Sequence, residues 1–185
     1  GQLLATLANH QDTLTSIAFS PDGKTLVSGS EDNTINLWKI EDEKAELIKT
    51  IRGHQDGITS VAFSPDGKFF ASGSYDKNIK IWREDGSFVT NLNKQGLAIA
   101  AIEFSNDGKT LASASWDNTI ELWKVIDLDR DRIEPFKTLA GHRGGVTSLN
   151  FTKDGKVLTS SSSDGTIKIW NVRDGSLLKT LLGHT

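Results

Sequence analysis

The sequence contains neither cysteine nor methionine, and only three of its 185 residues are proline. Without cysteine the chain forms no disulfide and offers no thiolate as a nucleophile or metal ligand. Such a composition is compatible with a reducing compartment, and we expect a cytoplasmic location. A natural reading frame begins with methionine, so we expect the sequence to be an excerpt, a processed form or an engineered chain.

The sequence also lacks long apolar runs and a strong charge of either sign. No stretch approaches the length of a membrane span, and no secretory signal segment opens the chain. The net charge of −3 is ordinary for a globular protein. We therefore expect neither a membrane nor a nucleic acid as a partner.

What the sequence does contain is one pattern that occurs four times. Each copy has a His or Gln, then a Ser, an Asp and a Trp at unchanged spacing, and a period of this length indicates a repeat protein. The four sets are His10, Ser28, Asp32 and Trp38; His54, Ser72, Asp76 and Trp82; Gln95, Ser113, Asp117 and Trp123; and His142, Ser160, Asp164 and Trp170.

Each repeat is predicted to be a meander of four short antiparallel strands. In the second repeat the alternation of apolar residues and the turn sequences predict strands near 58–63, 68–74, 80–82 and 87–92. Ser64-Pro65-Asp66-Gly67 supplies the first reversal. Charged insertions, expected as solvated loops, lengthen the third connection at 41–46 and 127–134. Because such a sheet has two apolar faces, it requires a like neighbour on each side.

Several motifs recur together and resemble WD40 repeats over essentially the whole chain. They are the Gly-His pairs at 53–54, 141–142 and 183–184, the SPDGK turns, the SGS or SAS segments and the Asp-x-x-Ile-x-x-Trp endings. One departure is consistent: Lys39, Arg83, Lys124 or Asn171 follows the Trp, where the family's name has Asp.

The resemblance implies an all-β, single-domain WD40 β-propeller over residues 1–185. Its four blades are expected at about 10–51, 54–92, 95–139 and 142–181. Residues 2–7 resemble the fourth strand of the last repeat, so an extra outer strand is expected there. Since WD40 rings usually hold six to eight blades, we expect the four blades to belong to a larger ring or to be completed by oligomerisation.

The resemblance also implies that the recurring His, Ser, Asp and Trp form a buried, hydrogen-bonded structural tetrad within each blade. Gln95 replaces the His in the third blade and cannot reproduce the ring geometry. We therefore predict that Ala112 to Trp123 is less protected from hydrogen exchange than Ser72 to Trp82.

A catalytic interpretation of the Ser, His and Asp is possible but is disfavoured by their repetition, because an enzyme needs one triad whereas a scaffold needs its network in every blade. Asp127, Asp129 and Asp131 resemble the start of a calcium loop, but Arg132 and Thr138 stand where Gly and Glu are required. No phosphate-binding or nucleophile motif is present. We expect no enzyme, no cofactor and no metal site.

In WD40 proteins, partners commonly dock on the rim that carries the residue before the tetrad Asp. The resemblance places candidate partner-binding residues there, at Glu31, Tyr75, Trp116, Ser163, Thr13, Thr15, Gly57, Thr59, Ala98, Ala100, Gly145 and Thr147. Trp116 is the single tryptophan outside the tetrads. Two interpretations stay open: its ring packs on the neighbouring blade, or it anchors a partner.

The expected function is that of a non-enzymatic protein-interaction scaffold or sensor module, binding a protein or peptide at the rim of Trp116. Self-association or additional blades would cover the open sheet faces. A truncated or recombined propeller with no ligand of its own is the alternative, and an enzyme with a site between blades is a remote one.

Overall fold

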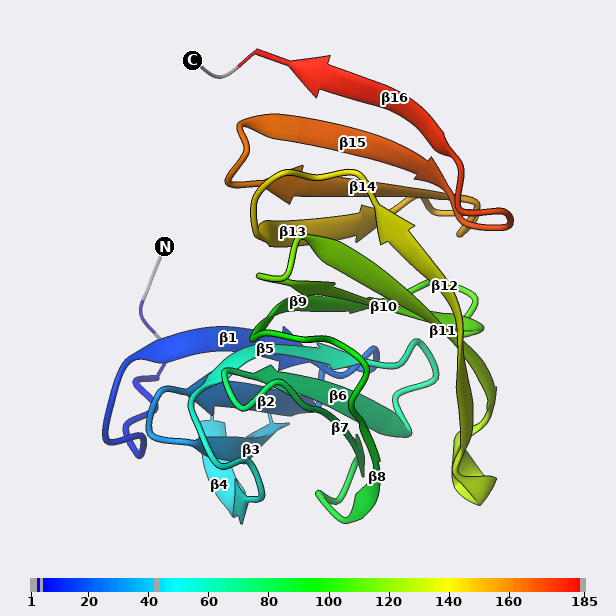
Figure 1. Cartoon of the computed structure of the whole chain (residues 1–185). Helices are drawn as coiled ribbons and strands as arrows, with labels where there is room; N and C mark the ends of the chain where they lie inside the picture. Colours follow the sequence, from blue (N-terminus) through cyan, green and yellow to red (C-terminus); the bar gives the residue numbers. More distant parts are fainter. Residues whose placement is uncertain (1–2, 4, 42–43, 184–185) are drawn as a thin grey trace.

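Four four-stranded antiparallel sheets follow one another along the chain in the computed structural model, which describes residues 3, 5–41 and 44–183. Each sheet is a blade whose strands lie in chain order, and Figure 1 shows the blades from blue β1 to red β16. The strands are β1 (Leu14–Phe19), β2 (Thr25–Ser30), β3 (Thr34–Glu41) and β4 (Lys44–Arg52) in blade 1; β5 (Ile58–Phe63), β6 (Phe69–Ser74), β7 (Ile79–Arg83) and β8 (Phe88–Leu92) in blade 2; β9 (Ile99–Phe104), β10 (Thr110–Ser115), β11 (Thr119–Asp127) and β12 (Arg132–Ala140) in blade 3; and β13 (Val146–Phe151), β14 (Val157–Ser162), β15 (Thr166–Asn171) and β16 (Leu177–Leu182) in blade 4.

The fold class predicted from the sequence is confirmed, and the strand ends predicted for the second repeat are shifted by at most one residue. The first strands of successive blades lie side by side, β1 with β5, β5 with β9 and β9 with β13. The first turn of each blade is set by its Asp: Asp66 Oδ1 accepts from Ser64 Oγ at 2.6 Å and from the Lys68 amide at 3.1 Å. Gly67 completes this turn at φ 73°, a conformation that suits glycine.

The sequence predicts that the two insertions are solvated loops, and this prediction is wrong. Both insertions extend the outer hairpins of their blades. β3 and β4 stay paired as far as Glu41 and Lys44, and β11 and β12 as far as Asp127 and Arg132. The tip of the second hairpin is the short 3-10 helix η1 (Leu128–Arg130), whose Leu128 is buried. The second insertion is therefore anchored to the core by Leu128, and the partly buried Ile133 packs against the same cluster. Within the described ranges, no helix has the length and apolar character needed to cross a membrane.

The expected extra strand at residues 2–7 is not observed. Leu3 and residues 5–7 are not in a strand, and Gln2 and Leu4 lie outside the described residues. A strand needs a ladder partner, and the outermost strand of blade 1 is already supplied by β4, which pairs with β3 along its whole length. The likeness of this segment to β16 is therefore a sequence likeness without the corresponding strand pairing.

The apolar core lies between the blades in three clusters. The first joins Val27, Ile35 and Leu37 of blade 1 to Ile58 and Val61 of blade 2. The other two clusters join blade 2 to blade 3 and blade 3 to blade 4 in the same way. Alternation along each strand thus places one apolar face against each neighbour, so no blade buries its core alone.

Glu103 is a charged residue in one of these interfaces. It lies on β9 where blades 1 and 2 have Ala18 and Ala62, and its Oε2 atom is buried with no hydrogen-bond partner. Burial raises the pKa of the Glu103 carboxyl, and the nearby backbone amide of Phe151 offsets this only in part. A carboxylate with one buried oxygen that lacks a hydrogen-bond partner opposes folding at neutral pH.

We expect Glu103→Gln to raise the melting temperature at pH 7 by about 2–4 °C, since that range corresponds to roughly 1 kcal/mol in a chain of this size. A carboxyl with a raised folded-state pKa destabilises the folded chain above that pKa and is neutral below the unfolded value. The gain should therefore vanish below about pH 4. Glu134→Gln, at an exposed position, is the control; an equal gain in both variants, or one independent of pH, would contradict the assignment.

Candidate functional site

The tetrad of blade 2 is a chain of hydrogen bonds with a fixed direction. Trp82 Nε1 donates to Ser72 Oγ at 2.8 Å, and Ser72 Oγ lies 2.7 Å from His54 Nε2. His54 Nδ1 lies 2.8 Å from Asp76 Oδ2. Because the indole can only donate, the serine hydroxyl is free to donate to Nε2, and the imidazole then donates from Nδ1 to the carboxylate. The four residues join the chain segment before β5 to β6, β7 and the turn between them.

Blades 1 and 4 repeat this arrangement closely. His10 Nδ1 lies 3.1 Å from Asp32 Oδ2, and His142 Nδ1 lies 2.9 Å from Asp164 Oδ2. In both blades Nε2 lies 2.8 Å from the serine oxygen. Three blades therefore have the same closed network from the indole to the carboxylate.

Blade 3 has an interrupted network. Ser113 Oγ donates to Gln95 Oε1 at 2.8 Å, but Gln95 Nε2 donates to the backbone carbonyl of Ser113 at 3.1 Å instead of to a carboxylate. Asp117 Oδ2 accepts from the Gly96 amide at 2.7 Å. The amide of Gln95 thus satisfies the serine without connecting it to Asp117.

An ion pair that the sequence pattern does not reveal adjoins this interrupted network. Lys94 Nζ lies 2.7 Å from Glu121 Oε2, and Thr138 Oγ1 donates to the other Glu121 oxygen at 2.7 Å. The Glu121 side chain is buried, while that of Lys94 is partly exposed. Blades 2 and 4 have Gly53 and Gly141 in place of Lys94. The sequence feature that could have indicated the ion pair is therefore the joint replacement of Gly-His by Lys-Gln in blade 3.

The carboxylates of the three tetrads that contain a histidine are held in the ionised form. Burial on its own would raise the pKa of Asp32, but hydrogen bonds from Thr34, the Gln11 amide and His10 lower that pKa to about 2. Burial acts in the same direction at Asp76 and Asp164, and hydrogen bonds from ring and backbone N–H groups again outweigh it and hold both pKa values well below the usual range. Folding and ionisation of these three groups are therefore linked.

This linkage predicts acid sensitivity below about pH 4. Each carboxylate has a lower pKa in the folded chain, so its stabilisation is complete above the unfolded value near 3.8 and is lost as the pH falls through its folded value, which is about 2 for Asp32. Thermal melts between pH 2 and pH 6 should show a steep loss below pH 4. Asp76→Asn should flatten this profile as well as lower it, and an unchanged slope in that variant would contradict the linkage.

The same geometry argues against a nucleophilic serine. All four tetrad serines are buried, and in blades 1, 2 and 4 the hydroxyl already accepts from an indole N–H and contacts the imidazole. A nucleophile needs access to its substrate and a free line of attack. The tetrads therefore act as internal connections within blades.

Two aromatic side chains, the exposed Trp116 and the half-buried Tyr75, lie together on the rim predicted to bind partners. Tyr75 and Trp116 meet edge to face with ring centroids 5.7 Å apart. They lie beside a depression of about 300 Å³, which we call the aromatic groove. Its lining residues come from the first strands of all four blades and from two turns: Thr15, Thr59, Tyr75, Ala100, Trp116 and Thr147.

Trp116 both packs locally and stays accessible. A Cβ added at Gly145 would lie 3.4 Å from Trp116 Cδ1, so the indole covers the glycine of the next blade. The side chain is nevertheless 51% exposed. The two interpretations of Trp116 are therefore not exclusive, because packing on Gly145 and Tyr75 fixes the ring while one part of it faces solvent.

Two threonine hydroxyls of the aromatic groove already donate hydrogen bonds within the chain. Thr15 Oγ1 donates to the carbonyl of Ile58 and Thr59 Oγ1 donates to that of Ile99, each at 2.6 Å and each in the next blade. These threonines have little polar capacity left for a ligand. The groove is therefore mainly an apolar and aromatic surface.

The remaining predicted rim residues do not line the aromatic groove. Thr13, Glu31 and Ser163 are exposed elsewhere on the rim. Backbone bonds from Glu31 to Thr13 and from Ser163 to Gly145 link them in pairs within blades. Gly57 is covered by the neighbouring Glu31 backbone and Tyr75, and Ala98 accepts from the Trp116 amide.

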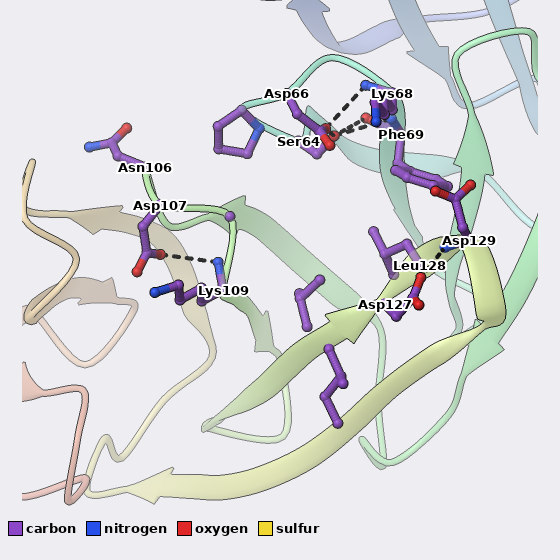
Figure 2. Close-up of a pocket in the computed structure, with 14 residues that line it drawn as sticks. Ser64, Asp66, Lys68, Phe69, Asn106, Asp107, Lys109, Asp127, Leu128 and Asp129 are labelled. Carbon is purple, nitrogen blue, oxygen red and sulfur yellow. Dashed lines mark hydrogen bonds between the residues drawn. The ribbon is translucent and has the colours of Figure 1, made fainter.

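A second depression lies at the turns of blades 2 and 3 and beside the hairpin tip of blade 3. Figure 2 shows Leu128 and Asp129 beside Phe69, with the turn of Ser64 to Lys68 nearby. Its carboxylates are engaged within the chain: Asp127 caps η1, and Asp129 pairs with Arg83 at 2.6 Å. Within residues 3, 5–41 and 44–183, no group of three or more His, Asp or Glu side chains could hold a metal ion.

The comparisons with known proteins agree with this architecture. Residues 14–181 match the family described as "Echinoderm microtubule-associated protein second beta-propeller". The chain belongs to this β-propeller family. The match extends from β1 to β16, so it covers all four blades of the propeller.

Curated relatives share single repeats with this propeller. The similar proteins include Protein HIR1 of Kluyveromyces lactis, 45% identical over 38 residues, and the periodic tryptophan protein 2 homolog of Neurospora crassa, 50% identical over 40 residues. The Notchless protein homolog of Arabidopsis thaliana is 47% identical over 38 residues. These alignments cover 20%, 22% and 20% of this chain but only 4%, 4% and 8% of the respective relatives. All are WD40-repeat proteins, so the propeller is of the protein-interaction scaffold type, a type that is generally non-enzymatic.

Proposed function

We propose that the propeller binds a protein or peptide segment at the aromatic groove, and that the segment inserts an apolar side chain beside Tyr75 and Trp116. The observation that carries this proposal is the exposed indole of Trp116, held edge to face against Tyr75. Large aromatic side chains fixed in place before binding lose little conformational entropy on association and are typical binding hot spots.

The chemistry of the groove favours an apolar occupant. The hydroxyls of Thr15 and Thr59 bond to backbone carbonyls of neighbouring blades, and Ala100 offers a methyl group. A charged side chain in this position would lose water without gaining a partner for its charge. The polar contacts of a bound segment would come from the surrounding rim, where Thr13, Glu31 and Ser163 are exposed.

We expect Trp116→Ala to weaken binding at least tenfold, since a truncated aromatic hot spot costs about 1.4 kcal/mol or more. Peptides selected from a displayed random library on the wild-type chain would be titrated against Trp116→Ala, Tyr75→Ala and Phe136→Ala. Phe136 is an exposed aromatic residue on β12 that does not line the groove, and its variant is the control.

Tryptophan fluorescence gives a second readout. The other four tryptophans are buried in the tetrads, so a peptide in the groove should shift mainly the emission of Trp116. Selected peptides that bind the Trp116→Ala and Tyr75→Ala variants with unchanged affinity would show that the groove is not the binding surface.

A further inference from the structure

The two end blades each leave one apolar face open. On blade 1, Leu14 is 50% exposed and Ile17 is 61% exposed. The equivalent residues of the other blades pack on the preceding blade and are at most 8% exposed: Ile58, Ile99 and Val146 for Leu14, and Val61, Ile102 and Leu149 for Ile17. The face of β1 is thus of the kind that packs on a preceding blade, and no described residue provides that blade.

Blade 4 has the opposite open face. Ile167, Ile169 and Leu181 are partly or largely exposed there. Their equivalents in the other three blades are buried against the following blade: Ile35, Ile79 and Ile120; Leu37, Ile81 and Leu122; and Ile51, Leu92 and Leu139. Blade 4 therefore presents the face that receives the first strand of a following blade.

A pair of hydroxyls on blade 4 indicates what that face receives. In blade 1, Thr15 Oγ1 donates to the Ile58 carbonyl of the next blade, and Ser16 Oγ accepts from the Val61 amide at 3.1 Å. Thr59 and Ser60 bond in the same way to Ile99 and Ile102. Each pair thus holds the first strand of the following blade at two backbone groups.

Blade 3 has Ala100 and Ala101 at these positions and packs on blade 4 without such bonds. Blade 4, in contrast, has the hydroxyl pair again as Thr147 and Ser148, and both residues are exposed. Among the described residues, Thr147 Oγ1 hydrogen-bonds only with Ser161 of its own blade. The pair is therefore in place to hold a strand that lies beyond blade 4, and on blade 1 the equivalent backbone groups are the Leu14 carbonyl and the Ile17 amide.

We propose that blade 4 of one copy of this chain docks on blade 1 of a second copy, with Thr147 and Ser148 bonding to Leu14 and Ile17 of that copy. The contact is head to tail, so it joins two different surfaces and must either close into a ring or continue as a filament. Two such contacts close a pair of chains into a ring of eight blades, which lies within the range of four to eight found in propellers. Pairing of two blade 1 faces would leave Thr147 and Ser148 without partners. This proposal is independent of any ligand in the aromatic groove.

Light scattering coupled to size exclusion tests the association directly. The 185-residue chain should elute as a species of about twice its mass of 20.2 kDa and dissociate on dilution. A monomer at every concentration would overturn the proposal and leave the open faces to further blades of a longer chain. Assemblies that keep growing with concentration would overturn the closed pair.

Two complementary variants test the head-to-tail geometry. Ile17→Asp alters only the blade 1 face and Ile169→Lys only the blade 4 face, so each variant alone should be monomeric because each copy contributes both faces. In a mixed pair, the unaltered blade 4 of the Ile17→Asp copy meets the unaltered blade 1 of the Ile169→Lys copy. At the other junction the introduced lysine faces the introduced aspartate, so the charges are opposite. We therefore expect pairs to form in the mixture and in neither variant alone. Pairs that survive Ile169→Lys on its own would overturn the proposal.

Controls separate association from folding. Ile48→Asp is the matched control. Ile48 lies on β4 and is 54% exposed although blade 2 packs on blade 1, and its equivalent on β16, Leu178, is also 54% exposed. The exposure of this position therefore does not depend on whether a neighbouring blade is present. It should leave the pair intact. The double variant Thr147→Ala and Ser148→Ala copies the alanine pair of blade 3 and should fold normally, with dissociation at least tenfold easier. Equal dissociation constants for this variant and the wild type would show that the hydroxyl pair does not hold a second copy.

Discussion

Asp76→Ala lowers the free energy of unfolding of blade 2 by about 2–4 kcal/mol in our expectation, because buried donors that lose a charged acceptor cost about 1–3 kcal/mol each. Asp76 accepts from His54 Nδ1 at 2.8 Å and from the amides of Gln55 and Asn78 at 2.9 Å. With the carboxylate removed, the ring of His54 loses the acceptor that orients it. The bond between His54 and Ser72 should weaken in turn, since the members of such a network polarise one another.

Asp117→Ala in blade 3 is the matched control, with an expected cost of about 1–2 kcal/mol from the lost acceptor alone. Asp117 accepts from the amides of Gly96 and Thr119 and from the Thr119 hydroxyl, but not from Gln95. Amide hydrogen exchange, followed by mass spectrometry in each blade, gives the local free energies. In the wild type, Ala112 to Trp123 should exchange faster than Ser72 to Trp82. Equal costs for the two substitutions would show that the ring contributes nothing beyond the backbone bonds.

The fold could be predicted from the sequence because its determinants lie within single repeats. Ser72 lies on β6, Asp76 in the tight turn that follows and Trp82 on β7, and every blade repeats this spacing. Alternation of apolar residues gave the strands, and Asp-Gly turns gave their ends. Four similar copies made each part of this prediction independent of any one residue.

The parts that could not be predicted depend on contacts between repeats. The orientation of Trp116 is set by Gly145 of the next blade and Tyr75 of the previous one, and no spacing within a repeat encodes it. The position of Leu128 under the second insertion depends on Phe69 of blade 2. A strand at residues 5–7 would need a partner strand that the sequence pattern alone does not supply. The sequence therefore predicts which residues lie on the rim, but it does not predict which of their side chains contact one another.

Contacts between repeats also decide which side chains fit at the blade interfaces. A Cβ added at Gly73 would lie 2.6 Å from Ile99 Cγ2 and 3.0 Å from Ile99 Cβ, closer than van der Waals contact allows. Gly29 has the same relation to Ile58 between blades 1 and 2. At the equivalent position of blade 3 stands Ala114, and the residue it faces is the smaller Val146. The extra methyl on one side is therefore matched by one methyl fewer on the other.

This size matching predicts a strong coupling between residues 73 and 99. Gly73→Ala should destabilise the interface of blades 2 and 3 by about 1–3 kcal/mol through overpacking, because the branched Ile99 side chain cannot move aside. Ile99→Val alone should cost about 0.5–1.5 kcal/mol. Ile99→Val keeps the Cβ and Cγ2 atoms that the new methyl group would meet, but it removes Cδ1, so the smaller side chain can shift away from residue 73. The double variant reproduces the Ala114 and Val146 pair, and we expect it to be more stable than Gly73→Ala alone. Urea unfolding of the four proteins closes the cycle. Additive effects would mean that the junction adjusts by shifting the blades apart, and the alanine and valine in blades 3 and 4 would then be an unrelated coincidence.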